Sequence, residues 1–473
     1  MQKENIMTAS LEENMSYLKE RLQPDVSFDI VYRVINVGGK QACIYFIDGF
    51  CKDELMQKLL QYFIDMKPED MPENAYEMSK KATPYVEVDL KDKWDDIFYN
   101  ILSGVFALFI DGFDRCILID SRTYPARGVS EPEKDKTLRG SKDGFVETVV
   151  FNTALIRRRI RSTELRMEMV NAGKSSKTDI VLCYMNNRVD HNFLEKIKKR
   201  ISEIKVDALT MNQESLAECL YKGNWFNPFP KFKFTERPDT ASAQILEGDV
   251  IILVDNSPSA MIIPTSIFDI VEEADDYYFP PITGTYLRLS RFLIGILTYL
   301  MTPTFLLLMQ RPEWIPESFR FIMVKETSNI PLIMQFLLLE LAIDGLKLAA
   351  INTPNMLSTP LSVMAALVLG EFSVNSGWFN SEVMLYMAFV AIANYTQSSY
   401  ELGYALKFMR ILNLILTAIF GVYGYVTAII ILILSIVCNK TLSGKSYVYP
   451  ILPLNFRQLA KRFLRLRLPE SKQ

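Results

Sequence analysis

Histidine is almost absent from this chain of 473 residues, in which His191 is the only one. A single histidine excludes histidine-based catalytic triads and metal sites built from several imidazoles. The simplest interpretation of His191 is a buried or helix-capping side chain. The six cysteines are scattered without Cys-x-x-Cys spacing, which indicates reduced thiols and neither a disulfide framework nor a zinc site. We therefore expect no enzyme, no metal and no cofactor.

The chain also lacks a strong net charge and an export signal. Its formal net charge is -3, and no basic strip is interleaved with aromatic residues, so no nucleic-acid partner is expected. The first residues are polar and partly acidic, where a signal peptide would need a basic region followed by an apolar run. The front part of the chain is therefore predicted to stay in the cytoplasm.

The character of the chain changes near Tyr286, after which long apolar stretches replace the mixed charges of the front part. These stretches cover residues 292–309, 331–339, 361–369, 383–393 and 411–437. About 20 apolar residues can cross the ~30 Å hydrocarbon core of a bilayer as a helix. The sequence thus predicts a membrane protein, with lipid as a partner, that carries a large soluble domain ahead of its membrane part.

Strand and helix patterns divide the front part into two mixed α/β subdomains. Residues 31–37 and 41–47 read as strands joined by a Gly38-Gly39 turn, and residues 53–66 and 94–102 read as amphipathic helices. The predicted fold class is an α+β cytoplasmic N-terminal domain followed by an all-α multi-span membrane domain. Its predicted parts are a helical lead-in (1–27), subdomain 1 (28–124), a linking helix with subdomain 2 (125–285), the membrane domain (286–440) and a basic cytoplasmic tail (441–473).

Charge at the ends of the apolar region predicts its topology. Arg288 and Arg291 precede the first apolar helix, and the basic tail, which includes Arg462 and Arg465, can lie against anionic headgroups. Both ends are then cytoplasmic, which requires an even number of crossings. We predict about four spans, at residues 288–309, 356–373, 380–396 and 411–438.

Two groups of residues in the apolar region could carry function. Glu340, Asp344 and Lys347 share one face of an apolar helix, and an ionised carboxylate at mid-bilayer costs about 2.5–3.5 kcal/mol. They lie either in the headgroup interface, or against a partner subunit, or along a watery passage, with the first two favoured.

Val363, Leu367 and Glu371 also share a helix face, within a segment rich in small residues. Around the axis of an oligomer this face could form an apolar constriction with a ring of carboxylates, as in cation pathways. The alternative is a packed helix whose terminal glutamate lies at the interface.

Two motifs in the front part have structural as well as functional interpretations. Gly173-Lys174-Ser175 ends like a phosphate-binding loop, but Glu168 stands where that motif needs a glycine, so a turn between strands explains it better. The arginines at 157–159 close a helix that is predicted to start near Gly144. They offset the helix dipole, or contact an acidic neighbour or lipid phosphates.

A long signature connects these parts. It includes Glu131-Pro132, Arg139-Gly140, Gly144-Phe145, Glu147, Asn152-Thr153 and Arg157-Arg158. With these motifs the chain resembles the GerA family of spore germination proteins, over about residues 28–465. The resemblance implies a two-part cytoplasmic domain and a membrane domain in the spore inner membrane. It also implies homo-oligomers that work with other germination membrane proteins and pass ions early in germination.

Within that family, residues 44–53 and 150–152 favour a receptor-A-like sporulation protein, associated with dipicolinic acid release, over a receptor A subunit proper. The resemblance therefore implies an ion-conducting or signal-transmitting component linked to early ion or dipicolinic acid release. The alternative is a non-conducting scaffold, or a germinant-receptor A subunit, that assembles other germination proteins. A secondary transporter is disfavoured because the membrane part has no visible internal repeat.

Overall fold

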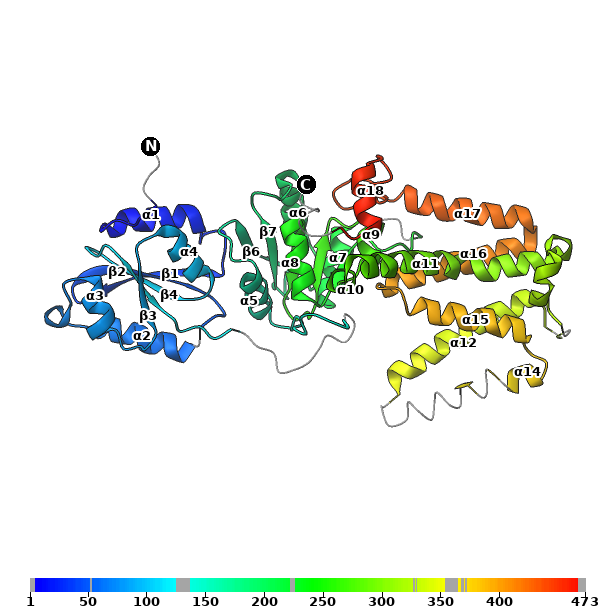
Figure 1. The fold of residues 1–473 in the computed structure, drawn as a ribbon, viewed down its shortest axis with the longest axis horizontal. Helices are drawn as coiled ribbons and strands as arrows, with labels where there is room; N and C mark the ends of the chain where they lie inside the picture. The colour runs from blue at the N-terminus through cyan, green and yellow to red at the C-terminus, as the bar shows by residue number, and fades with distance from the viewer. Residues whose placement is uncertain are drawn as a thin grey trace. The chain divides into compact units, whose positions relative to one another are not determined.

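The computed structural model describes residues 5–51, 53–124, 137–221, 226–325, 328, 330–353, 365–366, 370 and 372–466. The chain divides into two compact units. The first comprises Met1–Lys222 and Phe232–Pro264, and the second comprises Gly223–Lys231 and Thr265–Gln473. Figure 1 shows two sheets with their helices in the first unit and helices in the second. The predicted order, mixed α/β subdomains followed by a helical region, is confirmed.

The first unit begins with a five-stranded antiparallel sheet in the order β1-β2-β4-β5-β3. Its elements are α1 (Leu11–Leu22), β1 (Ile30–Val37), β2 (Lys40–Ile47), α2 (Asp53–Asp65), η1 (Pro68–Asp70), α3 (Ala75–Glu77), η2 (Met78–Ala82), β3 (Val88–Lys91), α4 (Trp94–Leu102), β4 (Phe106–Ile110) and β5 (Cys116–Ile119). The predicted hairpin turn is present, because Gly38 and Gly39 have φ values of 55° and 83° that favour glycine.

Helices cover both faces of this sheet. Successive residues of a strand point to opposite faces, so Cys43 and Tyr45 pack against α1 and α4, whereas Ala42 and Ile44 pack against α2. Because both faces are buried, β4 is apolar at every position and shows no polar alternation.

A second five-stranded antiparallel sheet has the order β6-β7-β9-β10-β8. Its elements are α5 (Val149–Arg159), β6 (Leu165–Ala172), β7 (Thr178–Met185), α6 (His191–Ser202), α7 (Asn212–Leu220), β8 (Lys233–Thr235), α8 (Pro238–Glu247), β9 (Val250–Val254) and β10 (Ala260–Ile263). Helices α5 and α8 share one core with the sheet, and α6 and α7 contact β6 and β9. The prediction that α5 starts near Gly144 is wrong, since the helix begins at Val149.

The second unit is helical among its described residues. Its elements are α9 (Ile267–Val271), α10 (Asp275–Tyr278), α11 (Pro281–Gln310), η3 (Pro312–Trp314), η4 (Glu317–Ile322), α12 (Leu332–Asn352), α14 (Ser373–Asn375), α15 (Ser381–Asn394), α16 (Tyr400–Phe420), α17 (Val422–Val437) and α18 (Phe456–Phe463). By length and composition, α11 and α16 can each cross a bilayer, and α15 and α17 are shorter apolar helices.

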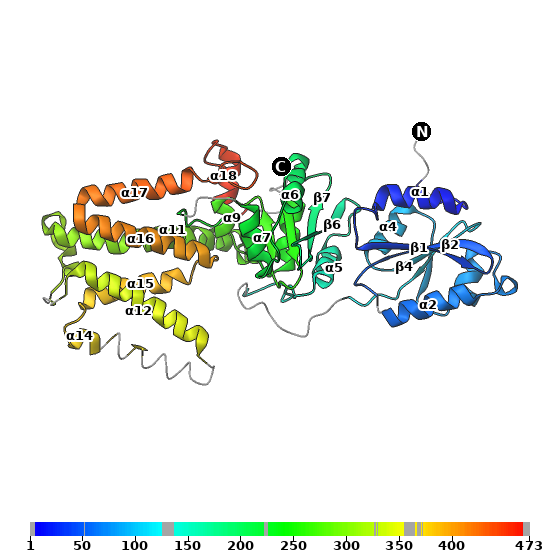
Figure 2. The same ribbon diagram turned by 180° about the vertical axis from the view of Figure 1, so that it is seen from behind.

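The predicted span over residues 411–438 is wrong as a single helix. Gly421 lies between α16 and α17 with φ of 60° and ψ of -132°, a backbone conformation open mainly to glycine. Figures 1 and 2 show α17 running back beside α16 from this point. A Cβ on Gly424 would come within 1.9 Å of the Leu416 carbonyl oxygen, so glycine also allows this close return. The predicted span over 356–373 lies largely outside the described residues.

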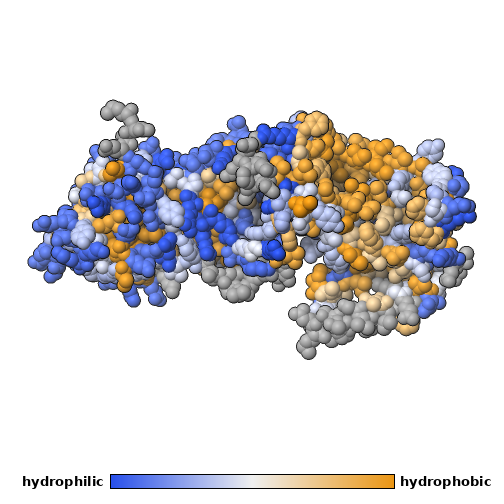
Figure 3. Space-filling view, viewed as in Figure 1, coloured by the Kyte–Doolittle hydropathy of each residue, from blue (hydrophilic) through white to orange (hydrophobic). Residues whose placement is uncertain are grey.

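The helical unit has a thin apolar core and an apolar exterior. Phe305, Phe336, Val383 and Leu414 bring α11, α12, α15 and α16 into one buried cluster. Figure 3 shows apolar residues covering much of the visible surface of this unit, whereas the two-sheet unit is mostly hydrophilic. A surface of this kind is stable only against lipid or protein.

Candidate functional site

Four charged side chains meet between two helices of the second unit. Glu340 and Asp344 come from α12, and Lys407 and Arg410 come from α16. Arg410 Nη2 and Nε lie 2.6 and 2.8 Å from Glu340 Oε1, and Arg410 Nη1 donates to the Thr298 carbonyl of α11 over 3.1 Å. Lys407 Nζ lies 3.6 Å from Glu340 Oε2 and pairs with the Asp344 carboxylate. We call these four residues the charge cluster.

The charge cluster is buried at its centre. Side-chain exposure is 4% for Glu340 and Lys407 and 2% for Arg410, but 32% for Asp344. Buried ions keep their charge at tolerable cost only when opposite charges and hydrogen bonds surround them. The positions of these residues in the sequence allow this pairing. Glu340 and Asp344 are spaced i,i+4 and share one face of α12, and Lys407 and Arg410 are spaced i,i+3 and share one face of α16. The cluster therefore connects α11, α12 and α16.

The partners of the two carboxylates, Lys407 and Arg410 of the same chain, are not among the alternatives that the sequence left open. The alternatives for Glu340, Asp344 and Lys347 were headgroups, a second subunit or a watery passage, whereas the structure brings the two carboxylates to cations of the same chain. Lys347 does not join them; its Nζ lies 5.3 Å from the ring centre of Tyr395 and 5.6 Å from that of Tyr404. Two cations within the predominantly apolar α16 were the available signal.

A second set of ion pairs surrounds the start of α11. Asp276, which is fully buried, accepts a hydrogen bond from Arg288 Nε over 3.1 Å and pairs with Arg291. Arg288 also reaches Glu272 over 3.1 Å, and Arg291 reaches Glu273 over 2.9 Å. The acidic segment before α11 thus neutralises the arginines that the sequence analysis used to mark the cytoplasmic end of this helix.

The chain returns to this acidic segment near its C-terminal end. Arg462 of α18 pairs with Asp269 and lies 3.1 Å from Glu272, and Arg465 donates to the Phe279 carbonyl over 2.5 Å. The sequence predicts that the basic tail lies against anionic lipid headgroups. For these two arginines the structure instead provides acidic and carbonyl partners within the chain.

Arg157 forms the most deeply buried ion pair of the first unit. Its Nε donates to Asp29 over 2.7 Å, with side-chain exposures of 0% and 2%, and its guanidinium also donates to the Ser162 and Leu165 carbonyls. Asp29 directly precedes β1, so the pair ties the first subdomain to α5 and the second. Contact with an acidic neighbour is one of the alternatives that the sequence left open for this arginine.

Neither the Cys43 thiol nor the turn at Gly173 has the features of a nucleophile or of a phosphate-binding site. Burial raises the pKa of the Cys43 thiol to about 12, far from a reactive thiolate at neutral pH. Gly173, with φ of 89°, forms a turn after β6, and the backbone N–H groups of Lys174 and Ser175 donate to the Val206 and Asp207 carbonyls. A phosphate-binding loop would need such N–H groups free. In the described ranges, no three His, Cys, Asp or Glu side chains are placed to hold a metal ion.

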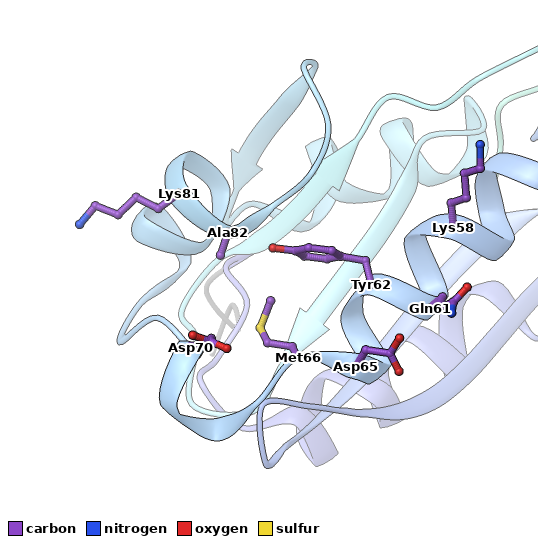
Figure 4. Close-up of a pocket in the computed structure, with 8 residues that line it drawn as sticks. All are labelled: Lys58, Gln61, Tyr62, Asp65, Met66, Asp70, Lys81 and Ala82. Atoms are coloured by element: carbon purple, nitrogen blue, oxygen red, sulfur yellow. The ribbon is translucent and has the colours of Figure 1, made fainter.

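An open depression of about 570 Å³ lies on the first subdomain, lined mainly by α2 and η2. Figure 4 shows Lys58 and Lys81 pointing away on opposite sides, whereas Tyr62 and Met66 point into the space between them. Side chains that diverge in this way do not define a ligand site, because binding sites need convergent polar groups.

Several predicted site residues lie outside the described part of the chain. These are Val363, Leu367 and Glu371 of the predicted constriction, and Glu131 and Pro132 of the signature. The constriction therefore stays a prediction.

Comparison with known proteins identifies the family. The family model described as Bacillus/Clostridium GerA spore germination protein matches residues 16–473. The chain belongs to the GerA family. Stage V sporulation protein AF of Bacillus subtilis (strain 168) is 36% identical over 97% of this chain and 93% of its own length. Spore germination protein KA of the same organism is 25% identical over 95% of this chain and 83% of its own length.

The predicted resemblance to this sporulation protein within the GerA family is confirmed. Among solved structures, the N-terminal domain of the A subunit of the Bacillus megaterium spore germinant receptor GerK3 is 27% identical. That match covers 55% of this chain and 97% of that chain, with a TM-score of 0.43.

The described part of the GerA signature surrounds α5. Asn152 accepts from the Val146 N–H over 2.8 Å and donates to the Val146 carbonyl over 2.6 Å, which fixes the extended segment before the helix. Phe145 is buried, and its N–H donates to the Glu236 carbonyl over 2.8 Å. These contacts explain why α5 begins at Val149, because the residues before it are held in a different conformation.

Other signature residues also hold α5 and the segments beside it in place. Thr153 Oγ1 donates to the Val150 carbonyl over 2.8 Å, and the Glu147 carbonyl accepts from the Asn256 N–H over 2.7 Å. The Arg158 guanidinium lies 4.8 Å from the ring centre of Tyr124. In this GerA chain the described signature residues thus support the connection between the two sheets.

Proposed function

We propose that this GerA-family protein is a multi-pass membrane component of spore germination that conducts ions, or transmits the signal for their release, as a homo-oligomer. It lies in the spore inner membrane with its two-sheet unit and its basic tail on the core side. It works with other germination membrane proteins, and it needs no cofactor and catalyses no reaction. Early release of ions or dipicolinic acid is the process that it serves.

The observation that carries the proposal is the charge cluster inside an apolar helical unit. Ionisable groups among membrane helices are costly, and where they persist they mark ion paths, relays or elements that switch between two pairings. Glu340 has two cations within reach, Lys407 and Arg410, so a shift of α12 along α16 could exchange its partners without leaving a charge unpaired. An element with two such pairings suits a gate or a signal relay.

The proposed constriction is formed by Val363, Leu367 and Glu371 around the axis of the oligomer. Small residues in this segment, such as Gly370, support close helix approach between subunits. A charged residue in place of Leu367 would keep such a constriction hydrated. Spores carrying Leu367→Glu should therefore lose their ions at an altered rate on germination, and normal release would count against this assignment.

The second candidate is a non-conducting scaffold, or a germinant-receptor A subunit, that assembles other germination proteins. It is supported by the relatives whose names describe spore germination proteins. Purified protein in liposomes loaded with potassium separates the two. A conducting protein releases the ion, and Glu340→Gln changes the rate. A scaffold leaves the liposomes as tight as protein-free ones, which would refute conduction.

A further inference from the structure

Polar side chains follow the contact between α11 and α16 beyond the charge cluster. Thr298, Tyr299 and Thr302 lie on α11, and Asn413 and Thr417 lie on α16; all five are buried. On α16 the polar positions follow Arg410 at intervals of three and four residues, which places them on one face of the helix. We call this row of polar residues, together with the charge cluster, the polar seam.

Within the described chain, three polar atoms of the seam beyond the charge cluster have no hydrogen-bond partner, and inside the cluster Asp344 Oδ1 has none either. The three are the Tyr299 hydroxyl, Thr302 Oγ1 and Asn413 Nδ2. The Tyr299 hydroxyl lies beside the Asn413 side chain, but the two form no hydrogen bond of normal geometry. By contrast, Asn413 Oδ1 accepts from Thr417 over 3.0 Å. Leaving a buried polar atom without a hydrogen-bond partner destabilises the protein, so these neighbouring cases point to a ligand that completes them.

The seam continues toward both ends of α16. At one end, Gln310 Nε2 donates to the Thr417 carbonyl over 3.3 Å and Gln310 Oε1 lies beside Gly421. At the other end, the unpaired Asn394 Oδ1 lies against Gly403. The 18 residues from Gly403 to Gly421 correspond to about 27 Å of helix, close to the ~30 Å thickness of a hydrocarbon core.

The unpaired atoms restrict the chemistry of the ligand. Two are hydroxyl groups, which donate and accept, and the third is an amide N–H, which can only donate. A bare cation needs oxygen ligands and gains nothing from the Asn413 N–H. Water both donates and accepts, and buried waters bind where otherwise unpaired polar groups converge. Water therefore fits all three groups.

We propose that the polar seam is a hydrated path through the membrane part of a single chain, with water bound at Tyr299, Thr302 and Asn413. The ion pairs of Glu340 with Lys407 and Arg410 close it part-way along. This path is distinct from the constriction proposed on the oligomer axis. It rests on the proposed membrane placement of α11 and α16, but it does not require that the protein conduct ions.

Hydroxyl-radical footprinting of the unmodified protein in nanodiscs tests the proposal, because radicals generated from bound water oxidise nearby side chains. Tyr299 and Phe305 lie on α11, each has 3% exposure and each packs in an apolar cluster, but Tyr299 also carries a buried hydroxyl without a hydrogen-bond partner. Tyr299 should be oxidised about tenfold faster than Phe305 if water is bound beside it. Similar slow rates at both residues would overturn the hydrated path.

A pair of variants gives a second measurement. Asn413→Cys places a thiol in the seam, whereas Leu414→Cys places one at a fully buried position in the apolar cluster. The thiolate attacks the thiosulfonate reagent, forms a mixed disulfide and displaces a sulfinate. Because the thiolate forms only where water reaches the thiol, modification at 413 should be about tenfold faster than at 414. Peptide mass spectrometry resolves these sites from the native cysteines. Equal rates would refute the proposal.

Potassium flux from liposomes, measured on the same preparations, separates this inference from the proposed function. Absence of flux refutes conduction and leaves the footprinting result to decide the hydrated path. A dry seam refutes the hydrated path even where flux is present.

Discussion

The buried pair of Asp29 and Arg157 allows a quantitative test of how the two sheets are joined. Asp29→Asn removes the carboxylate charge and leaves the Arg157 guanidinium buried at 0% exposure. Loss of one partner from a buried ion pair costs about 3–5 kcal/mol. At about 2–4 °C per kcal/mol for a domain of this size, the unfolding midpoint of the two-sheet unit should fall by about 6–20 °C. Thermal unfolding of the full chain in detergent, followed by near-ultraviolet circular dichroism, measures the shift.

An exposed pair in the same subdomain provides the matched control. Lys81 and Glu77 lie 2.8 Å apart at i,i+4 spacing, with exposures of 73% and 34%. Glu77→Gln removes the same type of charge but should leave the unfolding midpoint unchanged, because solvent screens such pairs. If Asp29→Asn shifts the midpoint no more than Glu77→Gln does, then burial does not determine the strength of the interaction and the reasoning fails.

Three further predictions concern the helical unit and the cysteines. Gly421→Ala should lower the free energy of unfolding by about 1–3 kcal/mol, because alanine is strained at this positive φ. Gly345→Ala, in a helix with open space around it, should be neutral or slightly stabilising. Equal shifts of the unfolding midpoint in scanning fluorimetry would refute the role of the turn. Glu340→Gln should destabilise the detergent-solubilised protein at low and high salt alike, since buried pairs are little screened; recovery at high salt would contradict burial. At pH 8, iodoacetamide should modify the exposed Cys438 and leave Cys43, with its pKa near 12, unmodified until unfolding; mass spectrometry of alkylated peptides distinguishes the two.

Local sequence patterns predicted the front part of the chain well. The hairpin at Gly38-Gly39 and the helix α4 have the expected bounds, because turn glycines and apolar spacing act over a few residues. The start of α5 was predicted too early, because the Asn152 side chain bonds to the backbone of Val146 and the residues before Val149 are not helical. Helix α8 was not predicted at all, although Pro238 at its first position is a helix-start signal.

Long-range pairing could not be predicted from the sequence in the same way. The hydropathy of the apolar run at 411–438 did not predict its reversal, because hydropathy depends on the solvent of a segment and not on its direction. Gly421 and Gly424 were the local signals. The partners of Glu340 lie about 70 positions away on α16, and charge alone does not specify which cation meets which carboxylate. Lys407 and Arg410 of α16 were not among the predicted site residues, although buried cations of this kind need a charge partner.

The contacts of Arg462 and Arg465 have a mechanical consequence. They attach the last described residues of the chain to the segment that precedes α11. The first and last described segments of the helical unit are therefore held together. A force applied to the C-terminal segment is transmitted to the N-terminal end of α11, and α11 cannot tilt unless these contacts break or move with it.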